Sequence, residues 1–489
     1  MTSESTYRQK TVTGIFWYFL QQFSYFGVQG ATTFILAWFL VPEDFGLMAM
    51  VTIFFSLGVT LMDSGISQAI IRKKEVGQID YSTAFFTNLG LGILAYAILF
   101  AAAPAIANFY NEPVLSPLVR IAGLVVVINS FQLIQIADLT RRMDFKVQFR
   151  VTLPTSLLSG IVAVALAGLG FGVWSLVAQM LIAALAVTVL YWITNRLRPT
   201  WEFSIESFQE MFGFGSKLFL SGLISTAYSN IYIVVIGKIF TALEAGYFYF
   251  VQQITALVVT LLCGVVQHVT YPALATLQDD DRTLKESFRN IIKTVVYVLY
   301  PGLIALIVLA EPIFRIVLKS EWLPAVPYLQ LLCISSLMYP LHAINLNILK
   351  VKGRSDLFLY LEIFKTILGL VILLISIPYG VFGILVGLIV SSVLSYVPNS
   401  YFSSTLIGYS IPDQVRDVLP LFLVASSMGL LMYVMGWLFS FSDIIEVIVI
   451  SFAGLVFYLI VNHIIRSEAQ SLLLHILEEQ LPLRVDNHE

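Results

Sequence analysis

Charged residues are scarce in this chain: Asp, Glu, Lys and Arg make up 12% of its 489 residues, whereas apolar residues make up 58%. About a quarter of the residues in a soluble domain are charged, so this composition excludes an ordinary soluble fold. Cysteine is almost absent. Cys263 and Cys333 both lie in apolar stretches, where we expect small buried side chains. The net charge of −3 gives no indication of a nucleic-acid partner.

Long apolar runs dominate the chain instead. Each is close to the ~20 residues that a helix needs to cross a membrane. Fourteen such segments can be placed, at residues 13–38, 45–62, 81–106, 115–136, 151–169, 173–192, 212–236, 245–269, 291–310, 326–348, 357–378, 381–402, 418–437 and 444–465. The sequence therefore predicts an all-α integral membrane protein with 14 transmembrane helices. No stretch between the segments is long enough for a soluble catalytic domain.

Most of the 27 Lys and Arg residues fall in alternate gaps between these segments. The basic gaps contain Arg72, Lys73 and Lys74; Arg141, Arg142, Lys146 and Arg150; Arg282, Lys285 and Arg289; and Lys350, Lys352 and Arg354. The opposite side shows only Arg120, Lys238, Arg315 and Lys319. Because positive charge stays on the cytoplasmic side of a membrane, we expect both termini to face the cytoplasm. The first segment is followed by no small-residue cleavage site, so we expect it to be retained.

Enzyme signatures are missing from the sequence. There is no Walker A motif, which excludes nucleotide hydrolysis by that route. The five His residues show no metal-ligand spacing. Gly168, Gly170 and Gly172 form a glycine-rich turn, but it joins two membrane segments, and we interpret it as a tight hairpin. We therefore expect neither an enzyme nor a bound cofactor or metal.

The sequence repeats itself at an offset of about 200 residues. FLVPEDFGLMAM (39–50) aligns with IFTALEAGYFYF (239–250), which places Gly46 on Gly246. GFGVWSLVAQ (170–179) aligns with PYGVFGILVG (378–387), which places Gly172 on Gly380, and LTRRMDFK (139–146) aligns with LKVKGRSD (349–356). Matched segments have the same membrane orientation, so we expect two parallel repeats of six helices. Such a repeat favours a transporter over a bare structural duplication.

The repeats divide the chain into five parts. We expect an N-terminal six-helix bundle at residues 1–192, a cytoplasmic linker at 193–211, a C-terminal six-helix bundle at 212–403, two extra helices at 404–466 and a cytoplasmic tail at 467–489. In and just after the linker, Ile205, Phe208, Met211 and Phe212 share one helical face. This pattern is typical of a short amphipathic helix on the membrane surface.

Several motifs together carry a family resemblance. LVPEDFG (40–46) precedes LMDSGISQAIIRKKE (61–75), and the second half contains SNIYIVVIGKIF (229–240), Gly246–Tyr247 and VTYPAL (269–274). In their order they resemble bacterial polysaccharide-exporting flippases of the MOP (multidrug/oligosaccharidyl-lipid/polysaccharide) superfamily, most of all the branch associated with colanic and teichuronic acid. The resemblance implies a V-shaped pair of bundles that moves a lipid-linked oligosaccharide from the inner to the outer leaflet of the bacterial inner membrane, by alternating access and without ATP hydrolysis. Relatives that flip other glycolipids carry several Arg residues in early helices; segments 13–38 and 45–62 have none, so that ligand set does not carry over.

The implied cargo is an undecaprenyl-diphosphate-linked oligosaccharide, which combines an apolar tail with an anionic diphosphate and a polar glycan. Membrane lipids, a polysaccharide polymerase and export machinery are the other partners that the resemblance implies. The polar head needs a wet cavity with at least one cation, and intramembrane ionisable residues usually face such a cavity. The sequence offers Asp63, Lys217, Glu362 and Lys365.

Each of these four residues has two interpretations. Lys217 either contacts the phosphate near the cytoplasmic side or snorkels to the interface. Glu362 and Lys365 lie three residues apart on one helical face. They form either a structural ion pair or a site at which the diphosphate, or a coupling proton or sodium ion, competes for one partner. Asp63 either caps a helix or loop or helps to close an inner gate. Lys217 and Lys365 are the only basic residues that we place inside the segments, because we assign Arg120 and Lys293, which lie near segment starts, to the membrane surfaces.

Four amide side chains are candidate sugar contacts. The first, second, seventh and eighth segments would line the cavity in this family, which singles out Gln22, Gln29, Asn230 and Gln252. Hydrogen bonding between helices is their alternative role.

Two other functions stay open. A multidrug or cation antiporter of the same superfamily would need one or two buried carboxylates in an apolar cavity. Asp63 is peripheral and Glu362 lies beside Lys365, which disfavours that function. A membrane polymerase or ligase of glycan chains would need a large outer loop with catalytic residues, which is missing from the sequence.

Overall fold

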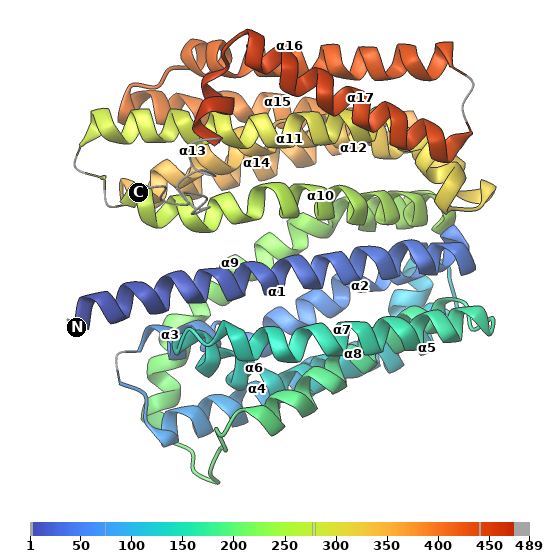
Figure 1. Ribbon diagram of the computed structural model, residues 1–489. Coiled ribbons are helices and arrows are strands. Elements are labelled where there is room, and N and C mark those ends of the chain that lie inside the picture. The colour runs from blue at the N-terminus through green and yellow to red at the C-terminus, as the bar shows by residue number, and fades with distance from the viewer. Residues whose placement is uncertain (1–2, 74, 276, 279, 440–441, 474–489) are drawn as a thin grey trace, which may run out of the picture. The chain divides into compact units, whose positions relative to one another are not determined.

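Helices account for all the regular structure of the residues described. The structure is a computed structural model and describes residues 3–73, 75–275, 277–278, 280–439 and 442–473 (Figure 1). Some helical positions, among them 3–16, 217 and 262–273, are described by their backbone alone. The chain forms two compact units, Met1–Phe250 and Val251–Glu489.

The first unit contains helices α1 to α9 and the beginning of α10. They are α1 (Ser3–Phe39), α2 (Pro42–Asp63), α3 (Ile66–Arg72), α4 (Gln78–Tyr110), α5 (Leu115–Ala122), α6 (Leu124–Arg141), α7 (Phe145–Gly168), α8 (Val173–Thr194), α9 (Ile205–Ile239) and α10 (Ala242–Ala275). α1 packs along α7 and α7 along α8, while α2 packs against α4 and α9 (Figure 1). The predicted segment 115–136 is therefore two helices, which meet at Gly123.

The ends of α2 follow from its sequence. Pro42 occupies the first turn, where a missing backbone N–H costs nothing, and the Asp44 carboxylate accepts a hydrogen bond from the backbone N–H of Val41. The helix ends at Asp63 because Ser64 and Gly65 both adopt left-handed conformations, with φ of 43° and 74°.

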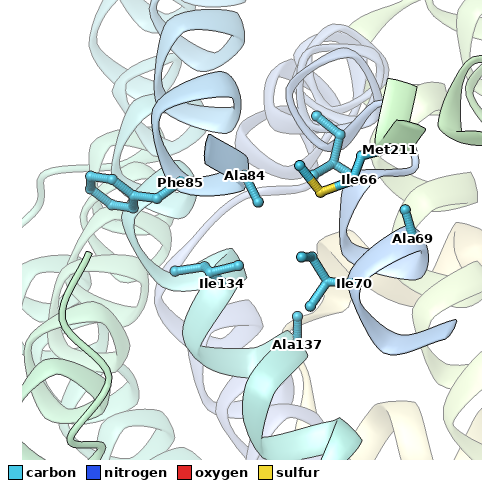
Figure 2. Close-up of a cluster of buried hydrophobic side chains, with 8 residues drawn as sticks. All are labelled: Ile66, Ala69, Ile70, Ala84, Phe85, Ile134, Ala137 and Met211. Carbon is cyan, nitrogen blue, oxygen red and sulfur yellow. The ribbon is translucent and has the colours of Figure 1, made fainter. Parts of the chain in front are cut away.

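A buried apolar cluster joins α3 to α4, α6 and α9. Figure 2 shows its side chains, which are Ile66, Ala69, Ile70, Ala84, Phe85, Ile134, Ala137 and Met211. Met211 is 2% exposed and belongs to α9, which runs unbroken from Ile205 to Ile239. Residues 205–211 are thus the first turns of a long helix, and the short separate surface helix predicted in the linker 193–211 is wrong. The cause is that neither Gly213 nor Gly215 interrupts α9, and Met211 is buried against α3, α4 and α6.

The second unit contains the rest of α10 and helices α11 to α17. They are α11 (Asp281–Val317), the 3₁₀ turn η1 (Ser320–Ala325), α12 (Val326–Ser336), α13 (Tyr339–Val351), α14 (Ser355–Ser376), the 3₁₀ turn η2 (Ile377–Tyr379), α15 (Gly380–Ile407), α16 (Ile411–Leu438) and α17 (Asp443–Ile464). α11 packs against α16 and α17, and α14 packs against α15 (Figure 1). The predicted segment 326–348 is again two helices, α12 and α13.

Positions that the repeat aligns have matching backbone conformations. Met143 and Gly353 both have positive φ, at 56° and 68°, and so do Gly172 and Gly380, at 55° and 73°. The residues that precede α7 and α14, Asp144 and Arg354, have φ/ψ of −88°/62° and −89°/62°.

The first turns of α2 and α10 touch through their backbones. A Cβ added to Gly46 would lie 1.8 Å from the carbonyl oxygen of Ala242, and a Cβ added to Gly246 would lie 1.8 Å from that of Pro42. Only glycine permits this approach. The contact is reciprocal, because positions 42 and 46 of one helix meet positions 242 and 246 of the other.

Eleven helical stretches among the described residues are long and apolar enough to cross a membrane. Three of them, Leu115–Arg141, Ser320–Val351 and Asp356–Ile407, each span more than one helix. Each predicted apolar segment lies on one helix or on successive helices. The chain is therefore a multi-pass membrane protein.

Candidate functional site

An ion pair lies halfway along α14, inside a stretch long enough to cross the membrane. The ammonium of Lys365 donates to the carboxylate of Glu362, one turn earlier on the same helix. The Lys365 side chain is 16% exposed and that of Glu362 43%. Charged groups are costly at membrane depth, and pairing lowers that cost. The structure thus brings these two predicted site residues together.

His342 belongs to α13, which packs against α14, the helix of this pair. Lys365 is near enough to act on the imidazole ring electrostatically. Nδ1 of the ring lies 2.9 Å from Nδ2 of Asn399, and Nε2 lies 3.2 Å from Oγ of Ser392. Asn399 and Ser392 belong to α15, so three helices of the second unit supply this group. Together they offer an ammonium that can bind an anion and two groups that can exchange protons.

The sequence spacing of the histidines does not single out His342, because that spacing is informative only about metal ligands. The informative signal is the position of His342 inside the predicted segment 326–348. The rule that singled out Asp63, Lys217, Glu362 and Lys365, that ionisable residues within a membrane mark functional sites, applies to it equally. Among the described residues, no group of three or more His, Cys, Asp or Glu is arranged to hold a metal.

The candidates of the first unit lie on α1, α2 and α9. Gln22 is half-buried and Gln29 exposed on α1. Asn230 on α9 donates to the carbonyl oxygen of Thr226 at 2.8 Å, a bond within its own helix. Asp63 ends α2, and its Oδ1 accepts from the backbone N–H of Ser67 at 3.1 Å. That is cap geometry, the simpler of the two roles expected for Asp63.

Two candidates are placed less fully. Lys217 lies in α9, but its side chain falls outside the described part of the chain. Gln252 is half-buried on the part of α10 that belongs to the second unit.

A buried lysine in α11 has its charge matched by carboxylates. Lys293 is 6% exposed, and its Nζ lies 3.1 Å from Asp417 and 2.6 Å from Glu468. Asp417 also accepts two hydrogen bonds of 2.6 Å from Arg289 and one of 2.7 Å from Tyr409. The hydrogen bond from Lys293 holds the pKa of Glu468 below its usual value.

The prediction that Lys217 and Lys365 are the only basic residues inside the helices is therefore wrong. Lys293 is the third residue of the predicted segment 291–310 and follows a basic gap, which assigned it to the cytoplasmic surface, but α11 begins at Asp281 and buries it. Because Lys293 is bound by two carboxylates, its evident role is to hold α11, α16 and the segment after α17 together.

The chain is similar in sequence to proteins of polysaccharide biosynthesis. Residues 35–327 match the family model described as "Polysaccharide biosynthesis protein". The chain is 24% identical over 442 residues to the lipopolysaccharide biosynthesis protein WzxC of Escherichia coli, across 87% of this chain and 89% of WzxC. It is 25% identical over 386 residues to the teichuronic acid biosynthesis protein TuaB of Bacillus subtilis, across 76% of this chain and 78% of TuaB.

Solved structures share the fold. The lipid II flippase MurJ superposes with a TM-score of 0.77 at 14% identity, across 92% of this chain and 98% of MurJ. A multidrug resistance transporter of the MATE family, in the MOP superfamily, superposes with a TM-score of 0.62 at 16% identity, across 78% of this chain and 95% of that protein. At these identities the likeness bears on the fold alone.

Proposed function

Because the chain belongs to the polysaccharide biosynthesis protein family, we propose that it moves an undecaprenyl-diphosphate-linked oligosaccharide from the inner to the outer leaflet for the synthesis of a surface polysaccharide. The chain is a membrane transport protein of the MOP superfamily rather than an enzyme. The mechanism that we propose is alternating access without ATP hydrolysis, coupled where needed to a proton or sodium gradient.

The observation that carries this proposal is the Lys365–Glu362 pair at the middle of α14. A diphosphate crossing hydrocarbon needs a cation, and Lys365 can exchange its carboxylate partner for a phosphate group. In the same proposal Lys217 contacts the phosphate nearer the cytoplasm and Asp63 belongs to the inner gate. The sugar contacts that we propose are Gln22, Gln29, Asn230 and Gln252.

The proposal extends to the topology. We propose that the chain crosses the membrane with fourteen helices. Residues 1–192 and 212–403 form parallel six-helix bundles in a V, joined by a linker, and are followed by two extra helices at 404–466 and a tail at 467–489. Matching left-handed residues, Met143 with Gly353 and Gly172 with Gly380, support the repeat. The reciprocal contact of Gly46 with Gly246 supports it independently. Both termini then face the cytoplasm of a bacterial inner membrane, where a polysaccharide polymerase and export machinery would receive the product.

A multidrug or cation antiporter is the alternative, and the fold does not separate the two functions, because a MATE-family transporter shares it. Glu362 is bonded to Lys365, so it is not the unpaired carboxylate that such an antiporter needs.

Deletion of the gene tests the proposal. The deletion strain should keep its lipid-linked oligosaccharide in the inner leaflet and lose its surface polysaccharide. Purified protein in liposomes should move that lipid between leaflets with no ATP present, and protein-free liposomes are the control. Polysaccharide export that continues in a deletion strain without a second copy would contradict the flippase, and drug sensitivity as the only defect would favour the antiporter.

A further inference from the structure

Hydrogen bonds around His342 indicate which ring nitrogen carries its proton. Nδ2 of Asn399, which can only donate, lies 2.9 Å from Nδ1, so Nδ1 is the acceptor. The proton of the neutral ring then resides on Nε2, which donates to Oγ of Ser392 at 3.2 Å. The hydroxyl of Ser392 in turn donates to the carbonyl oxygen of Ser335 at 3.4 Å. Both nitrogens of the neutral His342 ring therefore have a hydrogen-bond partner.

The same side chains can also hold the ring after it gains a proton. Asn399 is fully buried, and its Oδ1 accepts no hydrogen bond from the described part of the chain. A buried amide oxygen without a donor is unusual. A half-turn of the Asn399 amide exchanges Nδ2 for Oδ1 and presents an acceptor to the new Nδ1–H of His342. The surroundings of the ring thus fit either protonation state.

Burial of the ring and, after it, the neighbouring charges govern when that proton binds. Helix α13, which carries His342, packs against α11, α14 and α15. From α14, Lys365 acts on the ring and is itself bonded to Glu362. Tyr396 of α15 lies on the helix face that carries the hydrogen-bond partners of the ring. Tyr300 of α11 interacts with Tyr396. Both phenols are neutral at physiological pH, so Lys365 is the charge that opposes a second cation, and an anion at Lys365 removes that opposition.

We propose that His342 takes up a proton when a diphosphate headgroup binds at Lys365, so that two positive charges face the two negative charges of the ligand. This inference rests on the proposed function and adds a second anion-binding group to it. Proton and diphosphate then bind cooperatively, because each strengthens the binding of the other by the same factor. Diphosphate binding should consequently absorb protons from the solvent near neutral pH.

Isothermal titration calorimetry on the full chain in nanodiscs measures this uptake. Farnesyl diphosphate is titrated at pH 7.5 in buffers of different ionisation enthalpy, which gives the number of protons absorbed per ligand. The wild type should absorb a measurable fraction of one proton. His342→Gln should absorb none and bind about tenfold more weakly, as the loss of one charge-assisted hydrogen bond predicts. His463→Gln, which changes the exposed histidine in the last turn of α17, is the matched control and should behave as the wild type.

Two further measurements complete the test. Asn399→Leu keeps the imidazole but removes the acceptor, so it should bind farnesyl diphosphate with less proton uptake, and it decides the matter if His342→Gln does not fold. Inorganic diphosphate should show the same uptake at lower affinity, whereas equal affinity would identify a free phosphate ligand and overturn the lipid assignment.

The outcomes separate this inference from the function on which it rests. Binding without proton uptake in the wild type, or uptake that persists in His342→Gln, would overturn the inference and leave the flippase intact. If the wild-type protein binds no diphosphate and polysaccharide export also survives deletion of the gene, both the inference and the proposed function are overturned.

Discussion

A lysine within a membrane helix needs a matching charge, and two lysines of the second unit are matched to different degrees. Lys293 is 6% exposed and bound by two carboxylates, Asp417 and Glu468. Lys365 is bound by the carboxylate of Glu362, whose side chain is 43% exposed. The half-exposed carboxylate of Glu362 is easier to displace than the two carboxylates that hold the buried Lys293, so we expect Lys365 to bind the anion and Lys293 to have a structural role.

The first prediction concerns Lys365. Lys365→Ala should impair export more than Lys217→Ala, by roughly tenfold or more, because its position halfway along α14 leaves water and loop residues unable to replace its charge. The measurement is the rate of polysaccharide export, normalised to the amount of protein in the membrane.

Because Lys365→Ala leaves Glu362 without its partner, low expression could imitate lost transport. The double variant Glu362→Gln/Lys365→Gln removes both charges and keeps the shape. If it inserts normally and exports at the wild-type rate, the pair is structural and the site assignment fails.

The second prediction concerns Asp417. Asp417→Ala should destabilise the protein by about 3 kcal/mol, because it leaves Arg289 and the buried Lys293 with one carboxylate fewer. Thermal unfolding in detergent measures the change. The control is Glu286→Ala, which breaks the exposed pair with Arg282 and should cost less than about 1 kcal/mol. Equal losses in the two variants would mean that Lys293 finds other partners or water.

At the scale of the elements, apolar length predicted where helices lie but not where they break. The breaks at Gly123 and at Leu337–Met338 fall inside continuous apolar runs, and hydropathy does not register where helical hydrogen bonding is interrupted. The seven-residue α3 was missed because it is too short to cross a membrane. The start of α9 was placed too late because polarity alone does not distinguish a linker residue from a residue in the first turns of a helix.

The candidate site was predictable only where its residues are neighbours in sequence. Glu362 and Lys365 are three residues apart, so helical periodicity was enough to pair them. His342 meets Asn399 across 57 residues and Lys293 meets Glu468 across 175. A single sequence carries no signal of which distant helices touch, so these contacts needed the structure.

The third prediction concerns the crossing of α2 and α10. Gly46→Ala and Gly246→Ala should each lower the melting temperature and reduce export, since either methyl group would collide with a backbone carbonyl and overpacking costs about 1–3 kcal/mol. Gly27→Ala and Gly90→Ala are the controls, because nothing lies within 4 Å of a Cβ added there. Alanine should stabilise those helices slightly. Losses as large in the controls would show that helix flexibility matters rather than the crossing.

At the scale of the molecule, the fourth prediction concerns membrane orientation and follows from the distribution of basic residues. Reporter fusions should be cytoplasmic at Glu75, Met143 and Asp281, and external at Glu43, Asn111 and Glu321. The physical reason is that positive gaps stay on the cytoplasmic side. Alkaline phosphatase and green fluorescent protein fusions give opposite signals for the two sides, and an inverted pattern at most sites would refute the orientation.

The reciprocal contact of Gly46 with Gly246 also bears on the ancestry of the chain. In this contact positions 42 and 46 meet the equivalent positions 242 and 246 of the other repeat, just as a surface meets its own copy across the twofold axis of a homodimer. If the two bundles that we propose descend from one six-helix ancestor, a single glycine codon lay on that axis, and any mutation there changed both subunits at once. Gene fusion ended this constraint and let the halves diverge, so that Lys365 now corresponds to the uncharged Thr155 at the offset of the aligned basic turns. On this history the glycine crossing is the older feature, and the charge that distinguishes the second half is the younger one.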